Sequence, residues 1–403
     1  MMDARARLSF VGAVGALVIL YFASGSPISL YSMWQEELGM SHAQLSMVSM
    51  WYLLGTVIPL LFLPRISDHL GRRPATIIIL TVAVCGAVTF AMISNPEMIM
   101  AGRLIQGIAS GLGSSTVAAY VVDLSADLPR WVGPTITSSA PTLGLSTGAF
   151  VSGGLMTYTS VSSTSYFEAV AVLIVVIAVI VVFARETMPR KPGLLRSLVP
   201  RITLPKGCGR LYAACAMLFI GTWAVGGFSQ SFSASIVTEQ FGVHNQFIAA
   251  AVFTSLLLPN VVGSFFSNRF ETRQAQRWGM GIFLVMLVMM YASLAYLDSL
   301  VLFCVFSVVA GIGQGIGFTA GVTALLSRAG KELRAGTFST IYLTSYGGAA
   351  IPNFVVGLLP GTHAVLDILS WYVILIAVMY AVMLLLSAKP YPEVRSEELI
   401  ADA

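Results

Sequence analysis

Charged residues are scarce in this chain of 403 residues, and their scarcity excludes a soluble fold. Asp, Glu, Lys and Arg together make up 10% of the sequence, hydrophobic residues make up 57%, and the mean hydropathy is +0.84. A soluble domain carries about 25% charged residues, because water has to solvate its surface. The composition therefore predicts an all-α membrane protein.

Cysteine is also rare, and the four that are present have no disulfide or metal-site spacing. They are Cys85, Cys208, Cys215 and Cys304. The sequence also lacks a nucleophile–base pair, a metal-binding cluster and a phosphate-binding glycine loop. We therefore expect no enzymatic activity, no cofactor and no metal site. The net charge of +4 follows from the membrane topology described below, so it does not indicate a nucleic-acid partner.

Long apolar stretches fill the sequence instead, and each can cross a hydrocarbon core of about 30 Å. The simplest interpretation is twelve transmembrane helices. The stretches cover approximately residues 9–32, 45–63, 75–94, 98–122, 133–157, 166–184, 209–231, 246–268, 276–297, 300–327, 337–359 and 366–387.

Basic residues are absent from every second gap between these stretches. All Lys and Arg except Arg103 lie in the N-terminal arm, the C-terminal tail or five alternate gaps. By the positive-inside rule, both termini and the basic gaps are cytoplasmic. We therefore expect a multi-pass protein of the inner (cell) membrane. The first stretch resembles a cleavable signal peptide, but it continues to Tyr31, so we interpret it as the first span.

A basic, proline-containing segment divides the spans into two sets of six. We predict an N-terminal six-helix bundle at residues 1–184, a cytoplasmic linker at 185–208, and a C-terminal six-helix bundle and tail at 209–403. Weak internal similarity supports a duplication, which predicts a substrate cavity between the halves near the bilayer midplane. The matching positions are Pro59 with Pro259, Gln106-Gly107 with Gln314-Gly315, and Arg130 with Arg334.

The segment between the second and third stretches resembles the loop signature of the major facilitator superfamily. Residues 64–73 align with the family pattern G-x-x-x-D-[RK]-x-G-[RK]-[RK], and Asp68, Gly71, Arg72 and Arg73 match it. Pro64 replaces the usual Gly, and His69 replaces the usual basic residue. Two further motifs resemble those of the drug and metabolite proton antiporters. They are Arg103-Leu104-Ile105-Gln106-Gly107 in the fourth stretch, and Gly144, Gly148, Ser152 and Gly153 in the fifth.

The loop signature indicates a conformational latch formed by charged residues. Asp68 and Arg72 lie four residues apart in a tight loop, and Asp123 at the cytoplasmic end of the fourth stretch is the expected third partner. Such a cluster holds one conformer and has to break for the other. Gly71 and Arg73 complete the predicted latch. The resemblance implies that Asp68 also faces the start of helix 11. Ordinary loop charges that set topology are the alternative.

Arg103 is the one cation predicted within the hydrocarbon region. It would bind an anionic substrate group, or hold backbone carbonyls and a proton site as the family motif implies, or snorkel to the outer interface. We assign it to a substrate cavity whose aromatic and amide side chains suit a bulky, partly apolar ligand. The other predicted cavity residues are Tyr31, Gln106, Trp223, Gln230, Gln314, Phe318, Tyr342 and Tyr346.

Proton coupling requires a side chain that can change its protonation state, and the sequence offers few within the spans. Glu168 and Asp367, near the outer starts of two stretches, are the candidates, although either would also serve as an ordinary interfacial carboxylate.

We expect a secondary active transporter that works by alternating access, with proton-coupled efflux of drug-like molecules or metabolites as the leading interpretation. An organic-anion transporter that is not driven by protons is the alternative. The expected partners are a small-molecule substrate, protons and the lipid bilayer, with the protein acting as a monomer.

Overall fold

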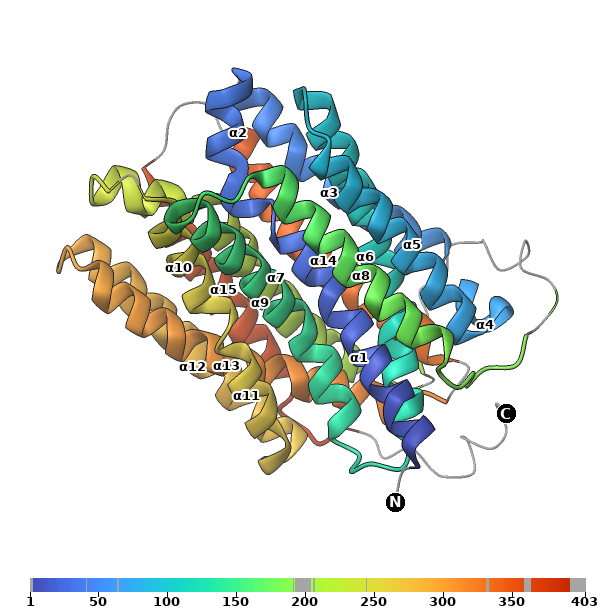
Figure 1. The fold of residues 1–403 in the computed structure, drawn as a ribbon. Coiled ribbons are helices and arrows are strands. Elements are labelled where there is room, and N and C mark those ends of the chain that lie inside the picture. The colour runs from blue at the N-terminus through green and yellow to red at the C-terminus, as the bar shows by residue number, and fades with distance from the viewer. Residues whose placement is uncertain are drawn as a thin grey trace. The chain divides into compact units, whose positions relative to one another are not determined.

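The chain folds into helices throughout the residues that the structure, a computed structural model, describes (Figure 1). These are residues 3–40, 42–63, 65–190, 192, 204–205, 207–243, 245–330, 333–358 and 364–391. No β-strand occurs among them, so the all-α prediction is confirmed.

The chain divides into two compact units. Unit 1 comprises Met1–Thr203 and Lys331–Leu343, and unit 2 comprises Leu204–Gly330 and Thr344–Ala403. The division falls within helix α14 (Arg334–Leu358), whose first part groups with unit 1 and whose remainder groups with unit 2. The bundle boundaries expected at residues 184 and 209 stay predictions.

Unit 1 contains the helices of the N-terminal half. Asn95 and Ser162 cap the starts of two of them by accepting hydrogen bonds from backbone N–H groups three residues on, as N-cap side chains commonly do. The elements are α1 (Ala4–Gly25), the short helix η1 (Ile28–Leu30), α2 (Tyr31–Leu38), α3 (His42–Phe62), α4 (Ile66–Leu70), α5 (Arg72–Ala91), α6 (Pro96–Leu124), α7 (Val132–Tyr158) and α8 (Ser163–Val182).

Unit 2 contains the later helices. The predicted stretch at 246–268 is divided at Pro259 into two helices, since proline has no N–H to continue the ladder of hydrogen bonds. The elements are α9 (Gly209–Ser235), the short η3 (Ile236–Gln240), α10 (Gln246–Leu257), α11 (Asn260–Phe266), η4 (Ser267–Arg269), α12 (Thr272–Ala295), α13 (Leu300–Leu326), the later part of α14, and α15 (Val365–Leu386).

Each predicted apolar stretch corresponds to a helix or a pair of helices. Within the described part of the chain, nine helical segments are long and apolar enough to cross a membrane. The remaining three stretches form α3, α7 and α14, each of which contains an internal proline.

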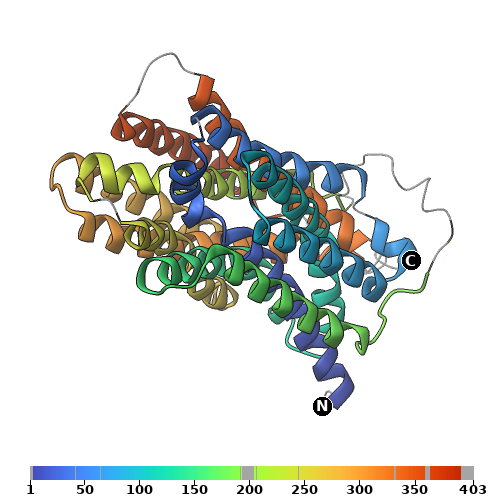
Figure 2. The same ribbon diagram turned by 45° about the horizontal axis from the view of Figure 1, so that its top comes forward.

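Helix packing in unit 1 recurs in unit 2. In unit 1, α5 packs against α6 and α8, and α1 lies beside α7 and α8 (Figures 1 and 2). In unit 2, α12 packs in the same way against α13 and α15. A Cβ atom added at Gly107 would collide with the carbonyl of Tyr52, and one added at Gly315 would collide with that of Asn260. Gly107 and Tyr52 of the first contact correspond to Gly315 and Asn260 of the second, each at a distance of 208 positions in the sequence. This correspondence supports the predicted duplication.

Candidate functional site

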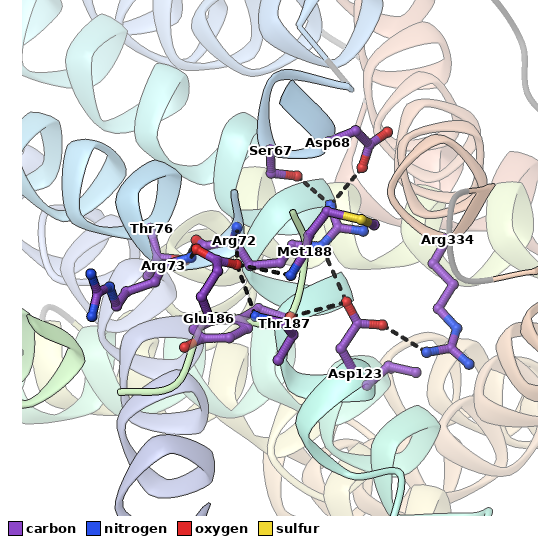
Figure 3. A network of polar contacts seen from close by, with 12 residues as sticks. Ser67, Asp68, Arg72, Arg73, Thr76, Asp123, Glu186, Thr187, Met188 and Arg334 are labelled. Carbon is purple, nitrogen blue, oxygen red and sulfur yellow. Dashed lines mark hydrogen bonds and ion pairs between the residues drawn. The ribbon is translucent and has the colours of Figure 1, made fainter. Parts of the chain in front are cut away.

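A buried cluster of charges joins helices α4, α5, α6 and the start of α14 in unit 1 (Figure 3). The guanidinium of Arg72 donates to Asp68 Oδ1 at 2.9 Å, to Asp123 Oδ2 at 3.2 Å and to the hydroxyl of Ser67. Asp123 Oδ1 accepts from Arg334 Nη1 at 2.7 Å. The structure therefore brings the predicted residues Asp68, Arg72 and Asp123 together.

Opposite charges balance one another in this cluster. The side chains of Arg72 and Asp123 are fully buried, so each would be costly without a partner of opposite sign. Burial raises the pKa of the Asp68 carboxyl above its usual range, and the neighbouring Arg72 opposes that shift. Asp68 therefore takes up a proton at a higher pH than an aspartate in water, and protonation weakens its ion pair with Arg72.

Glu186 closes the N-terminus of α5 from a distant part of the chain (Figure 3). Its Oε1 accepts from the N–H of Arg72 at 2.8 Å, and its Oε2 accepts from the N–H of Arg73 at 3.1 Å. Gly71, which precedes α5 with φ of 91°, has no side chain for this purpose. A Cβ on Gly71 would lie 2.5 Å from Glu186 Oε2 and would displace the carboxylate that caps α5, and the positive φ of this position favours glycine.

The predicted latch differs from the observed cluster in its membership. The guanidinium of Arg73 donates to backbone carbonyls at the end of α8 and does not join an ion pair among the described residues. The expectation that Asp68 faces helix 11 stays a prediction, and the charged contact that the structure shows at the start of α14 runs from Arg334 to Asp123. Sequence reasoning missed Arg334 and Glu186 as members. The signals available were the position of Arg334 as the repeat partner of Arg130, and the acidic Glu186 within a basic segment.

A second polar site lies where α1 ends, ahead of Pro27. Proline has no N–H, so the carbonyl of Ala23 lacks the hydrogen bond that a continuing helix would supply. Gln106 Nε2 on α6 donates to this carbonyl at 2.8 Å. Ser152 on α7 donates similarly to the carbonyl of Ser26 at 2.8 Å. Side chains of neighbouring helices therefore satisfy the interrupted backbone, as a break within a membrane requires.

Arg103 belongs to this second site. It is 1% exposed, and its Nη1 donates to the carbonyl of Ser24 at 2.7 Å and to Gln106 Oε1 at 3.3 Å. Its guanidinium carbon lies 5.4 Å from the ring centroid of Tyr31 and 4.6 Å from that of Tyr52. The snorkelling interpretation is wrong, because the side chain is enclosed within unit 1. Of the three interpretations, this geometry favours the one in which Arg103 holds backbone carbonyls.

Arg103 also has unused binding capacity. It forms no ion pair with a carboxylate among the described residues, and its Nε has no hydrogen-bond partner. The hydroxyls of Tyr31 and Tyr52 are likewise buried without a partner among the side chains that the structure describes. A buried cation with neutral acceptors and aromatic faces remains electrostatically suited to an anion.

Five of the predicted cavity residues lie in unit 2, and three of these form an aromatic group. Trp223 on α9 lies 4.9 Å from Tyr346 and 6.3 Å from Phe318, measured between ring centroids. Gln314, four residues before Phe318 on α13, is 3% exposed, and its Oε1 has no hydrogen-bond partner within the described ranges. Gln230 lies half-buried further along α9.

The remaining predicted site residues lie apart from these groups. Tyr342 is buried in unit 1, where its hydroxyl donates to the carbonyl of Thr137 on α7 at 2.7 Å. Glu168 and Asp367 are exposed, near the starts of α8 and α15. No cluster of potential metal ligands occurs among the described residues.

These features define a multi-pass α-helical membrane protein with polar sites buried among its spans. Residues 13–206 match the model of the Major Facilitator Superfamily. The fold is similar to that of the human organic anion transporter MFSD10 (TETRAN), with a TM-score of 0.71 and 15% identity over 94% of this chain and 100% of that one. The chain therefore has the major facilitator fold, residues 13–206 belong to this family of transporters, and the resemblance seen in the sequence is confirmed.

Curated relatives match shorter segments. The multidrug resistance protein MdtL of Klebsiella pneumoniae subsp. pneumoniae is 36% identical over 109 residues, which cover 27% of each chain. The probable glucose transporter rco-3 of Neurospora crassa is 29% identical over 115 residues, which cover 28% of this chain and 18% of that protein. The chain thus matches about a quarter of the length of these relatives, or less.

Proposed function

We propose that this protein is a secondary active transporter that works by alternating access and exports drug-like molecules or metabolites in exchange for protons. The buried cluster of Arg72, Asp68, Asp123 and Arg334 carries the proposal. The partial similarity to MdtL, named as a multidrug resistance protein, supports the substrate class. We place the protein in the inner membrane as a monomer with both termini in the cytoplasm.

The cluster is suited to act as a latch because of where Arg334 lies. Arg334 begins α14, and the later part of that helix, from Thr344, belongs to unit 2. Asp123 therefore ties α6 of unit 1 to a helix that both units share. Breaking the contact between Asp123 and Arg334 would free the start of α14, and re-forming it would restrain that start. A two-state contact of this kind biases one conformer without touching substrate.

The proposed ligand is bulky, with aromatic or apolar surface and a hydrogen-bond donor. Trp223, Phe318 and Tyr346 present aromatic faces, and Gln314 offers an unpartnered acceptor. Apolar walls with a few placed polar groups are typical of sites for such molecules.

Reconstitution in liposomes tests the function directly. A pH gradient imposed across liposomes containing the purified protein should drive accumulation of a lipophilic fluorescent dye, and Asp68→Asn should abolish it. Uptake equal to that of protein-free liposomes, across a panel of dyes and antibiotics, would contradict the proposed substrate class.

An organic-anion transporter not driven by protons is the second candidate, and one observation favours it. Arg103 is a buried cation without a carboxylate partner among the described residues. The similarly folded MFSD10 is named as an organic anion transporter. Proton flux distinguishes the two candidates, because addition of substrate to vesicles releases or consumes protons only if the exchange is coupled to them.

A further inference from the structure

Three arginines of unit 2 converge on one short segment of the chain. Arg210 lies in the first turn of α9, and Arg273 and Arg277 lie in the first two turns of α12. Each donates to residues 387–390, which follow α15. Arg273 Nη2 donates to the carbonyl of Ala388 at 2.8 Å. Arg277 donates from Nη2 to the carbonyl of Ser387 at 2.8 Å and from Nε to Ser387 Oγ at 3.0 Å. Arg210 Nη2 donates to the carbonyl of Lys389 at 3.1 Å and to that of Pro390.

These contacts leave the positive charges unbalanced. The acceptors are neutral carbonyl or hydroxyl oxygens, and none of the three arginines forms an ion pair with a described carboxylate. Nε of Arg210 and Nε of Arg273 are buried and have no hydrogen-bond partner in the part of the chain that the structure describes. Lys389 adds a further exposed cation. Unit 1 differs, because Asp3, Asp68 and Asp123 form ion pairs with three of its arginines.

The segment is held in place beside the arginines. The hydroxyl of Tyr391 donates to Gln276 Oε1 at 2.8 Å, and the guanidinium carbon of Arg210 lies 5.9 Å from the centre of the Tyr391 ring. The basic group formed by Arg210, Arg273, Arg277 and Lys389, hereafter the basic group of unit 2, is therefore held together by contacts within unit 2.

Aromatic side chains with high exposure adjoin these charges. Trp278 follows Arg277 on α12 and is 64% exposed, and Phe270, just before α12, is 44% exposed. Tryptophan is enriched at the level of lipid headgroups, where its ring is partly in hydrocarbon and partly in water. This part of α12 therefore has the characteristics of a segment at the membrane–water interface.

We propose that the basic group of unit 2 binds the phosphodiester headgroup of an anionic phospholipid such as phosphatidylglycerol. Clusters of Lys and Arg at the ends of transmembrane helices attract acidic lipids, and guanidinium groups match the geometry of phosphate oxygens. The exposed Trp278 beside the charges favours a lipid over a dissolved phosphate ion, because an acyl chain would cover its ring. The inference does not depend on the transport function, although the predicted topology places the lipid in the cytoplasmic leaflet.

Native mass spectrometry of the purified full-length protein tests this site. Titration with phosphatidylglycerol should yield a saturable lipid adduct, and phosphatidylcholine should yield a weaker one. The double variant R273Q/R277Q should weaken phosphatidylglycerol binding by roughly 30-fold, since each interfacial cation contributes about 1 kcal/mol. The matched variant R5Q/R7Q removes the same charge from the N-terminal arm of unit 1 and should bind like the wild type.

Two further arms keep the inference falsifiable. R273K/R277K retains the charge and should retain most of the lipid binding, so a loss caused by misfolding is distinguishable from a loss of charge. Deletion of residues 392–403 removes Glu393, Glu397 and Glu398, so it tests whether anionic residues of the tail affect lipid binding to these cations. Wild-type affinity in R273Q/R277Q, an equal loss in R5Q/R7Q, displacement of the lipid by millimolar inorganic phosphate, or lipid binding only after the tail is deleted would each overturn the proposal.

Discussion

Asp123 forms ion pairs with two arginines of unit 1. Its carboxylate is fully buried and accepts hydrogen bonds from Arg72 and Arg334. Removing its charge leaves two guanidinium groups facing each other without an anion between them. Buried charges that lose their partner destabilise a protein more than surface pairs do.

Replacing Asp123 with asparagine should therefore lower stability. We expect Asp123→Asn to reduce the free energy of unfolding by about 3 kcal/mol, to be measured by denaturant titration in detergent. The control is Asp127→Asn, because Asp127 is exposed three residues beyond the end of α6 and should change stability by less than about 0.5 kcal/mol. If the two substitutions lowered the free energy of unfolding equally, burial of the Asp123 charge would not contribute to stability.

Asp68→Asn should separate stability from transport. Because burial raises the folded-state pKa of Asp68, the folded protein binds this proton more tightly than the unfolded chain. The wild type therefore gains stability from protonation at low pH and loses it as pH rises through the folded pKa. Asparagine does not titrate, so the difference in free energy of unfolding between Asp68→Asn and wild type should favour the variant most near pH 7. This difference should decrease as pH falls toward 4. Transport by Asp68→Asn should be lost at every pH. Melting temperatures across this range measure the first effect, and a constant difference would contradict it.

Substitutions of Arg103 distinguish substrate binding from backbone support. If Arg103 binds an anionic group, Arg103→Ala should weaken ligand binding by about tenfold or more and Arg103→Lys should retain part of the affinity. If it serves to hold the carbonyl of Ser24, Arg103→Ala should lower the melting temperature and leave affinity for an established substrate unchanged. Calorimetric titration and thermal unfolding of both variants give the two readouts.

At the scale of single residues, sequence reasoning identified the charged cluster better than its connections. Asp68 and Arg72 lie four apart in a recognisable loop, so their contact follows from local geometry. The contact between Arg334 and Asp123 spans 211 positions, and the contact between Glu186 and Arg72 spans 114. Contacts this distant depend on how helices pack, which one sequence does not specify.

At the scale of elements, the end of α1 depends on a side chain of α6. Pro27 removes the N–H that would satisfy the carbonyl of Ala23, and Gln106 supplies the missing donor. The two residues should therefore be energetically coupled although they do not bond to each other.

A double-mutant cycle tests this coupling. Gln106→Ala should destabilise the wild type by about 1–2 kcal/mol, because a buried carbonyl loses its donor. In a Pro27→Ala background, the restored N–H can satisfy Ala23, so the same substitution should cost about 1 kcal/mol less. The control is Gln230→Ala on α9 of unit 2, which should have the same effect in both backgrounds. Strict additivity of Pro27→Ala and Gln106→Ala would contradict the explanation of the break.

Helices were more predictable than their interruptions. The twelve stretches could be recognised by their length and hydrophobicity, because a helix that crosses a bilayer has to be long and hydrophobic. Helices end next to Pro27 and Pro259, where the missing N–H interrupts the ladder of hydrogen bonds. The short α4 within the loop signature, by contrast, has no apolar periodicity, and its form depends on Arg72 and the glycine that follows it.

At the scale of the whole molecule, the proposed exchange for protons requires a side chain that can take up and release a proton. Asp68 and Asp123 lie in the ion-pair cluster, whereas the predicted carboxylates Glu168 and Asp367 are exposed on α8 and α15.

Glu168→Gln tests the predicted coupling site. If Glu168 carries the proton, this variant should lose accumulation driven by a pH gradient and keep exchange of substrate between the two faces, because exchange needs no net proton movement. Asp367→Asn is the matched control. Transport assays in liposomes with and without a pH gradient measure both activities, and full pH-driven accumulation by Glu168→Gln would exclude it as the coupling residue.

The capping of α5 by Glu186 has a consequence for the covalent continuity of the chain. The last apolar helix of the first half, α8, ends at Val182, but the carboxylate that completes the start of α5 lies four residues later. A protease cut between Ala184 and Glu186 would leave every membrane-spanning helix of that half intact and still detach the cap. A separately expressed first half would therefore need to extend at least to Met188, whose N–H also donates to Glu186.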